Sequence, residues 1–271
     1  MAMRVRVGCE FNFQVDIPVA MVMMVRPDGA HRFAKESTDL FPEVSFREYM
    51  DSFGNRCWRF TAPGGPITLR YDAIVVMENP ADLVVTQGNL SHPSDLPDHT
   101  LMYTLPSRQI ESDLLLNDAW QLFGHTPPTW ERVQAICDWV HQNVQYIAEH
   151  SGPEMLGSAV AVFQRRSGVC RDFALMSIAF CRALNIPARY VFGYLPDIGL
   201  IGPQTPMDFH AWFEAFIDGQ WHTFDARHNV QRIGRIAIGR GRDAIDVAIS
   251  TAYGDARLLK MVVWADQVPN Y

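Results

Sequence analysis

Two stretches of this chain decide its fold: residues 167–174 read SGVCRDFA, and residues 210–225 read HAWFEAFIDGQWHTFD. In the first stretch, a Gly turn leads into an apolar pattern with helical spacing, which predicts a helix from about Cys170 to Leu184. In the second, two strand-like runs flank Asp218-Gly219, which is the strongest short hairpin signal. A helix that starts at a cysteine is therefore followed by a hairpin that carries a histidine and an aspartate.

Cys170 stands where a thiol can become a nucleophile. At the start of a helix a thiol meets unpaired backbone N–H groups and the positive end of the helix dipole, and both favour the thiolate. Arg171 adds positive charge, whereas Asp172 acts against the thiolate, and the sequence does not say which neighbour dominates. The alternative is that Cys170 is a small buried hydrophobe, as most free cysteines are. Its position directly after a Gly turn favours the reactive interpretation.

The hairpin supplies the partners that such a thiol needs. If Asp218-Gly219 form the whole loop, the strand register places His210 and Asp225 on one face as diagonal neighbours, within side-chain reach. A catalytic base needs its tautomer fixed, and a carboxylate beside the ring does this. His222 falls on the opposite face and is a poor rival. We therefore predict Cys170 as nucleophile, with the histidine as its base and the aspartate as the group that orients the base.

These residues resemble those of the transglutaminase-like superfamily, and specifically of its bacterial transglutaminase-like proteins. The quoted cysteine segment and CRALNIPARYV at 181–191 match the family's cysteine motif, HAWFEA at 210–215 the histidine motif, and WHTFD at 221–225 the aspartate motif. YTLPSR at 103–108, GRDAIDV at 241–247 and a β-rich N-terminal region extend the likeness to nearly the whole chain. The resemblance implies Cys170, His210 and Asp225 as the catalytic residues.

The resemblance also implies a fold and a chemistry. The fold is α+β, with a papain-like core in which a central helix begins at the cysteine and packs on a sheet that carries the other two residues. The thiol would attack an amide or peptide carbonyl to form a thioester. Water would then give hydrolysis, which we favour, whereas a second amine would give transamidation, and a non-catalytic scaffold is the alternative from another class. The expected partner is a peptide or protein amide, without a cofactor or a metal.

Two further residues are weaker candidates for the site. An oxyanion hole needs donors, and the backbone N–H of Cys170 is the natural first one. Gln164 stands six residues before the cysteine, as the oxyanion glutamine does in papain-like enzymes, and is a candidate second donor; the alternative is a polar residue at a helix end. Trp212 is expected either to form a wall of the site beside His210 or to have only a packing role.

The rest of the chain reads as two regions. Residues 1–100 are expected to form a β-sandwich-like domain, because several short apolar runs alternate with Pro and Gly turns. A polar, Pro-containing stretch at Gly88–Thr100 reads as a linker, and residues 101–271 as the catalytic core. We expect strands at 5–16, 19–25, 31–37, 44–50, 56–61, 67–77, 188–195, 209–217, 220–225 and 258–265. We expect helices at 129–146, 159–165 and 170–184.

Composition and sequence pattern limit the binding partners and the cellular location that we expect. The 271 residues carry a formal net charge of −7, which argues against nucleic acid. The five cysteines are widely spaced, and with no Cys-x-x-Cys pair they predict neither a disulfide framework nor a zinc site. No targeting or membrane-spanning stretch is evident, so we expect a cytoplasmic protein without a membrane partner. A local basic cluster is expected to form surface ion pairs with Asp243, Asp246 or Asp255 rather than to bind a substrate carboxylate: Arg232, Arg235, Arg240 and Arg242.

Overall fold

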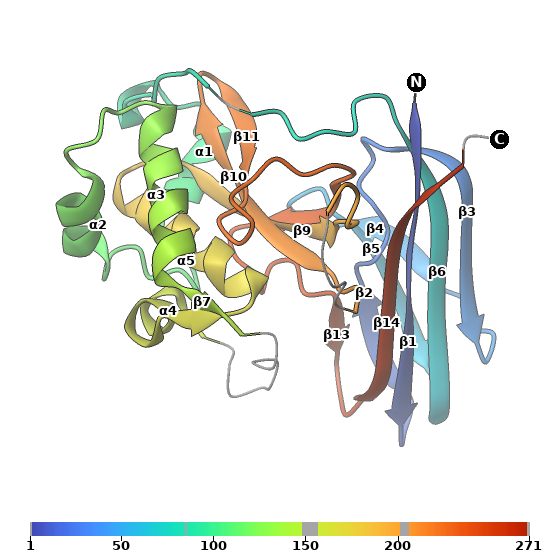
Figure 1. Ribbon diagram of the computed structural model, residues 1–271. Coiled ribbons are helices and arrows are strands. Elements are labelled where there is room, and N and C mark those ends of the chain that lie inside the picture. The colour runs from blue at the N-terminus through green and yellow to red at the C-terminus, as the bar shows by residue number, and fades with distance from the viewer. Residues whose placement is uncertain (1, 85, 148–156, 201–205, 270–271) are drawn as a thin grey trace.

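A β-sandwich and a helix-covered core lie side by side in the computed structural model, which describes residues 2–84, 86–147, 157–200 and 206–269 (Figure 1). The two sheets of the sandwich have the strand orders β14-β1-β6-β3 and β13-β2-β5-β4. Their strands are β1 (Met3–Val15), β2 (Val19–Met23), β3 (Arg32–Phe41), β4 (Arg47–Met50), β5 (Arg56–Ala62), β6 (Gly65–Met77), β13 (Ser250–Ala252) and β14 (Arg257–Val268). Each of the six predicted N-terminal strands has its counterpart among them. The apolar residues that alternate along β1 and β6 turn inward and are buried, as the two-residue period requires.

The end of the chain belongs to the sandwich, although we predicted residues 101–271 as one catalytic core. Strand β14 pairs with β1, and β13 pairs with β2. Val263 and Ala265 of β14 are buried beside the inward-facing residues of β1. An apolar strand cannot bury its face alone, and it joins the sheet edge that accepts it, however far away in sequence. The last two strands, which we predicted as part of the catalytic core, thus pair with strands of the first hundred residues.

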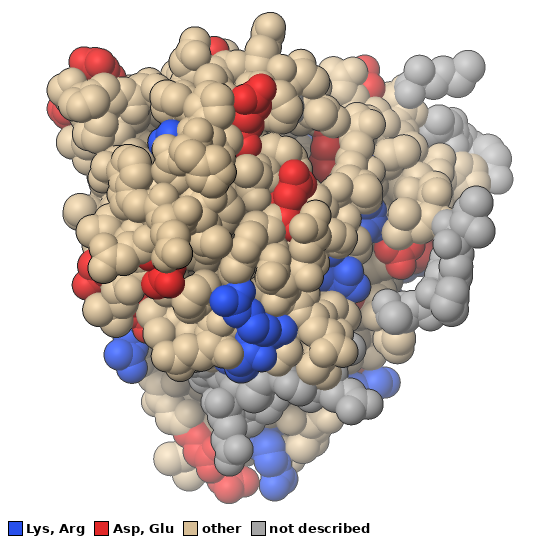
Figure 2. Space-filling view, turned by 60° about the vertical axis from the view of Figure 1, so that its left-hand side comes forward, with Lys and Arg blue, Asp and Glu red and all other residues tan. Residues whose placement is uncertain are grey.

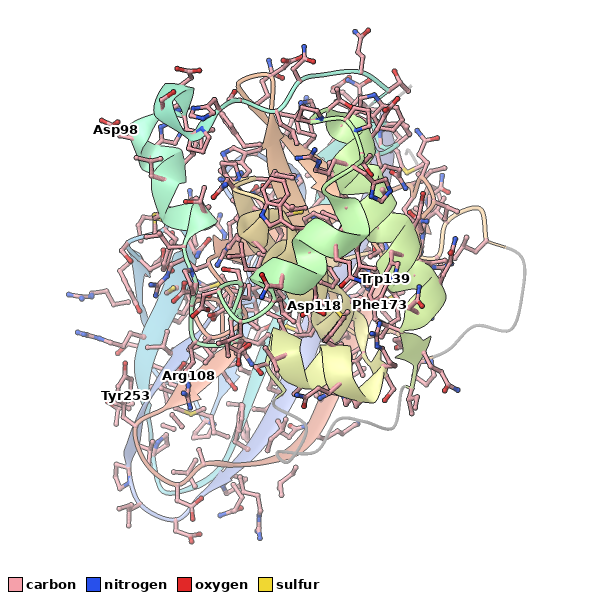
Figure 3. The ribbon with its side chains drawn as sticks, turned by 90° about the vertical axis from the view of Figure 1, so that its left-hand side faces the viewer. Asp98, Arg108, Asp118, Trp139, Phe173 and Tyr253 are labelled. Carbon is pink, nitrogen blue, oxygen red and sulfur yellow. The ribbon has the colours of Figure 1, made fainter. Side chains whose placement is uncertain are left out.

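The core packs helices on a four-stranded antiparallel sheet with the order β11-β10-β9-β12. Helix α5 lies against β10 and β9 and is itself covered by α2, α3 and α4 (Figures 1 and 3). The helices are α1 (Asp98–Leu101), α2 (Leu116–Phe123), α3 (Trp130–Asn143), α4 (Ala159–Arg165) and α5 (Cys170–Ala183), with 3-10 turns at Pro93–Asp95 and Met102–Thr104. The strands are β7 (Gln145–Tyr146), β8 (Ser167–Gly168), β9 (Ala188–Tyr194), β10 (His210–Ile217), β11 (Gln220–Phe224) and β12 (Ile236–Gly241).

Helix α5 is the buried axis of the core. Every residue from Asp172 to Ala183 is buried, because the helix has the sheet on one side and other helices on the other. An apolar helix with small residues on one face can pack this closely. The helix ends as predicted: Asn185 adopts a left-handed φ of 60° before Pro187.

The hairpin β10–β11 has the predicted register. Ile217 pairs with Gln220, so Asp218 and Gly219 form the two-residue loop. Both have positive φ, 47° and 78°, which a tight hairpin turn of this hand requires. The alternation of faces along the two strands is thereby fixed as far as His210.

The stretch predicted as a linker, Gly88–Thr100, lies on the core instead of spanning open space (Figure 1). The backbone oxygen of Gly88 accepts a hydrogen bond from the N–H of Trp130 at 2.9 Å. The N–H of Asn89 donates to the Asp218 carboxylate at 3.2 Å, and Thr100 is fully buried. In the described part of the chain, no helix combines the length and the apolar character needed to cross a membrane.

Candidate active site

The turn into α5 places Cys170 at the first position of the helix. The Asp172 carboxylate accepts a hydrogen bond from the backbone N–H of Val169 at 2.9 Å, and Asp172 is fully buried. Gly168 makes room for this carboxylate, because a Cβ at that position would lie 2.4 Å from Asp172 Oδ2. The glycine, the helix start and the aspartate thus form one rigid unit, from which the thiol projects.

The charges beside the thiol neutralise one another. Asp172 forms ion pairs with Arg165 at 3.2 Å and with Arg171 at 3.5 Å. The sequence left open whether Arg171 or Asp172 dominates, and the structure shows that the two are paired. Because a second arginine also faces the carboxylate, Asp172 does not act on a thiolate as an isolated negative charge.

Cys170 is the reactive candidate among the five cysteines. It is partly exposed, whereas Cys9, Cys57, Cys137 and Cys181 are at most 2% exposed. Burial raises the pKa of Cys9 to about 12 and that of Cys57 to about 11. Burial likewise raises the pKa of Cys137 and of Cys181. A thiol reagent in solution therefore meets Cys170 first.

His210 is the first residue of β10, and the sandwich helps to hold it there. The ring of the preceding Phe209 lies 6.2 Å from the ring of Phe11 in β1 and 5.3 Å from that of Tyr194 in β9. Asp225 directly follows β11, and His210 Nε2 lies 2.8 Å from Asp225 Oδ2. The predicted closeness of this histidine and this aspartate is confirmed.

The thiol completes a chain of three groups. Cys170 lies close enough to His210 to be one of the groups that raise the pKa of this imidazole. Since Asp225 engages Nε2, Nδ1 is the ring nitrogen left for the thiol proton. The structure thus brings Cys170, His210 and Asp225 together in the predicted order.

Electrostatics favour a charged imidazole in this chain. Burial by itself would lower the pKa of His210, but the charge and hydrogen bond of Asp225, together with the hydrogen bond of Cys170, raise it to about 9. Burial would raise the pKa of Asp225, yet His210 and Arg235 hold it far below its usual value. At neutral pH the pair is therefore an imidazolium facing a carboxylate.

Arg235 is a member of the site that sequence reasoning missed. Its Nη2 lies 3.1 Å from Asp225 Oδ2 and 3.0 Å from Asp82 Oδ2, and its guanidinium carbon lies 4.7 Å from the Trp212 ring centroid. It thus bridges the aspartate of the site to a carboxylate far earlier in the chain. The only sequence signal was its place in the basic cluster, for which nearby acidic partners were expected.

The basic cluster does form ion pairs, but with mostly distant partners. The predicted pair of Arg242 with Asp246 is present at 2.8 Å. The others reach across the fold: Arg232 to Asp197, Arg235 to Asp82 and Asp225, and Arg240 to Glu214 and Asp28. Tertiary packing brings these carboxylates together, and a local search along the sequence could not find them.

His228 lies beside the site and was not predicted. Its ring centroid is 4.8 Å from that of His210, its backbone N–H donates to Asp225 at 3.3 Å, and Arg232 lies 2.8 Å from its Nε2. Burial, then the positive charges of His210 and Arg232, lower the pKa of His228 to about 3. His228 therefore stays neutral beside the imidazolium.

This group also has the composition of a metal site. Ligand atoms of His210, Asp225 and His228 all lie within 4.8 Å of one another. However, Nε2 of His228 accepts from Arg232, and Oδ2 of Asp225 is shared by His210 and Arg235. The lone pairs that a cation needs are engaged, and two guanidinium groups would repel it, so hydrogen bonding explains the cluster better.

The two weaker candidates are placed differently from the expectation. Gln164 is exposed on α4 and its side chain makes no hydrogen bond to any described residue, so the structure gives its oxyanion role no support. Trp212 is 2% exposed and stacks at 6.2 Å on the ring of His210, between it and Arg235. Of the two alternatives, this burial and ring contact favour the packing role for Trp212.

A family model places this geometry among known proteins. Residues 120–226 match the model of the transglutaminase-like superfamily. The matched range begins in α2 and ends directly after Asp225, so it contains the thiol, the imidazole and the carboxylate.

Relatives extend the likeness beyond that range. An uncharacterised protein of Mycobacterium leprae is 33% identical over 119 residues, which cover 43% of this chain and 42% of that protein. An uncharacterised protein of Mycobacterium tuberculosis is 30% identical over 221 residues, covering 73% of this chain and 68% of that one. The crystal structure of a candidate cysteine protease from Cytophaga hutchinsonii has a TM-score of 0.87 and 31% identity, and covers 100% of this chain and 92% of its own.

Proposed function

The chain belongs to the transglutaminase-like superfamily, and from this premise we propose that it is a cysteine enzyme that hydrolyses an amide or peptide bond through a thioester. One observation carries the proposal: a partly exposed thiol lies beside an imidazole that a buried carboxylate holds at 2.8 Å. A nucleophile, a base and an orienting group in contact are what covalent acyl transfer needs.

In the first step the thiol adds to the carbonyl carbon of the substrate. The proton of Cys170 lies on His210 before the attack, the thiolate sulfur forms a bond to carbon, and the carbonyl oxygen becomes an oxyanion. The N–H of Cys170 at the helix start is suited to donate to that oxygen. The imidazolium then gives its proton to the amine nitrogen, the C–N bond breaks, and a thioester and an amine result. Asp225 stabilises the imidazolium throughout this step.

In the second step water resolves the thioester. His210 accepts a proton from water, the oxygen attacks the thioester carbon, and the C–S bond breaks to release a carboxylic acid and to leave the thiolate of Cys170 beside the imidazolium of His210. An amine in place of water would give transamidation. We favour hydrolysis because water is always at hand, whereas transamidation needs a bound amine and a shielded site. The likeness to a candidate cysteine protease supports a peptide as substrate.

Thiol alkylation tests the activated nucleophile without any knowledge of the substrate. Iodoacetamide near neutral pH is expected to label Cys170 selectively, and faster than a free thiol, with the adducts mapped by mass spectrometry. His210→Ala should slow this labelling strongly, whereas His222→Ala on the opposite face of the same hairpin should not. Labelling of folded protein no faster than that of a free thiol would favour the scaffold alternative.

The reaction itself needs a second experiment. Peptides with amide side chains and with internal peptide bonds are incubated with and without a primary amine, and products are followed by mass spectrometry. Acid products that persist with the amine present, and that vanish in Cys170→Ala, support a hydrolase. Amine adducts as the main product would instead make the protein a transamidase.

A further inference from the structure

A guanidinium that has no carboxylate partner among the described residues lies at the candidate active site. The guanidinium carbon of Arg227 is 3.7 Å from the centroid of the Tyr146 ring. Across the described residues, no Asp or Glu side chain forms an ion pair with Arg227, unlike Arg232 and Arg235 of the same region. A cation stacked on an aromatic ring keeps its N–H edge free to bind another group.

Backbone pairing fixes Tyr146 next to the thiol. Tyr146 is the partner of Gly168 in the parallel pair β7–β8, and the N–H of Ile147 donates to the Gly168 oxygen at 3.0 Å. Gly168 is two residues before Cys170. The Tyr146 ring also lies 6.5 Å from the ring of Phe173, which is one helical turn beyond the thiol on the same side of α5. Tyr146 itself is 40% exposed.

The other side of the stack is tied to the aspartate of the site. The backbone N–H of Arg227 donates to Asp225 Oδ1 at 3.1 Å. Its guanidinium is therefore held between the turn before Cys170 and the loop after Asp225. Figure 2 shows one group of basic side chains low on this face of the molecule, with other basic and acidic side chains scattered around it.

We propose that Arg227, stacked on Tyr146, binds a carboxylate of the substrate close to the amide that Cys170 attacks. The proposal rests on the proposed function. It narrows the substrates to amides that carry an anionic group close to the bond that Cys170 attacks. Guanidinium and carboxylate match as a bidentate pair. A local cation also offsets the net charge of −7, which would otherwise repel such substrates.

Two alkylating reagents of nearly equal size test this without a known substrate. Iodoacetate carries a carboxylate and iodoacetamide does not, so the ratio of their rate constants at Cys170 reports the local charge. We expect Arg227→Glu to lower this ratio at least about fivefold, Arg227→Met to lower it less, and Arg227→Lys to keep most of it.

Arg166→Glu is the matched control. Its guanidinium stacks on Trp139 and Phe163, whose rings pack around Phe180 in the far half of α5. The same charge reversal there should leave the ratio within about twofold, because interactions between exposed charges fade over about 10 Å. If Arg227→Glu and Arg166→Glu change the ratio equally, the effect is one of net charge and the proposal is wrong.

The results distinguish a failure of the Arg227 carboxylate site from a failure of the proposed enzyme function. Rapid, selective alkylation by iodoacetamide with an unchanged ratio in the Arg227 variants keeps the nucleophile and removes the carboxylate site. If Arg227→Glu does not fold, the rate ratios measured for Arg227→Met and Arg227→Lys test the proposal instead. A peptide with glutamate next to the hydrolysed bond, compared with its glutamine analogue, should show a raised KM in Arg227→Met for the acidic peptide alone.

Discussion

His210 is poised by groups on two other segments, the start of α5 and the loop after β11. Asp225 holds Nε2, Cys170 contacts the ring, and neutral His228 lies against it without adding charge. The pKa of about 9 makes the imidazolium the dominant form at neutral pH, and the proposed leaving-group protonation requires that form. The protonation state of this one residue therefore sets the pH range in which the site can work.

Asp225→Asn tests this assignment. Hydrolysis in the wild type should fall as pH rises through about 9, where the imidazolium is lost. Without the carboxylate charge, the pKa of His210 should drop towards the ordinary value of about 6.5, so the alkaline limb moves to lower pH. The measurement is kcat/KM against pH. Asp246→Asn, which affects only a surface pair with Arg242, should leave the limb in place.

The same pair links stability to pH. His210 has a raised pKa, so its contribution to stability is full below about pH 6.5 and is lost as pH rises through about 9. Asp225 has a lowered pKa, so its contribution is full above about pH 4 and is lost in acid. The difference in unfolding free energy between wild type and Asp225→Asn should therefore be largest near pH 5–6.5. A difference that grows towards pH 10 would contradict the assignment.

Helix α5 and the hairpin β10–β11 are the elements that local sequence could predict. Gly168, the apolar run after Cys170 and the loop Asp218-Gly219 are signals within a few residues of what they specify. Strand β12 and helix α2 were not predicted. Their signals are short, and their formation depends on packing against β9 and α5.

Gly168→Ala tests the turn that presents the thiol. The new Cβ would lie 2.4 Å from Asp172 Oδ2 and 2.5 Å from Asp172 Cβ, and the buried, ion-paired Asp172 cannot move away. Overpacking of this kind costs about 1–3 kcal/mol. We expect that loss in chemical denaturation, together with slower alkylation of Cys170. Gly29→Ala, whose Cβ would find its nearest neighbour at an ordinary 3.5 Å, is the control and should be nearly neutral.

Across the whole molecule, sandwich and core share one apolar interior and exchange polar contacts. Phe209 stacks on Phe11, and the hydroxyl of Tyr194 donates to the Val25 oxygen at 2.9 Å. Asp82, just beyond the sandwich, holds Arg235 and through it Asp225. The β-rich region thus supports the site.

Arg235→Met should be strongly destabilising. It leaves Asp82 and Asp225 without their shared cation, and breaking a buried pair in this way costs about 3–5 kcal/mol. Adding Asp82→Asn removes one of the stranded charges, so the double variant should recover at least about 1 kcal/mol of that loss. Denaturation of the two singles and the double measures the coupling. Additive losses would mean that the two side chains do not interact.

The last strand offers a matched pair of substitutions. Val263 faces Cys9 and is 6% exposed, whereas Val262 faces Glu10 and is 39% exposed. An unpaired amide at the inward position costs about 1–3 kcal/mol and adds to the lost apolar burial. Val263→Asn should therefore lower the unfolding free energy clearly more than Val262→Asn. Equal effects would mean that β14 does not complete the sandwich.

The sequence by itself determined the α+β character, helix α5 with its cysteine, and the pairing of His210 with Asp225, because each depends on residues near one another along the chain. The meeting of that pair with Cys170 came from resemblance, since forty residues separate the thiol from the histidine. Only the tertiary structure decided that Arg235, Asp82 and Tyr146 border the site and that β14 closes the first sheet. Those contacts join segments up to about 260 residues apart. No local sequence pattern indicates which distant segments a packed fold brings into contact.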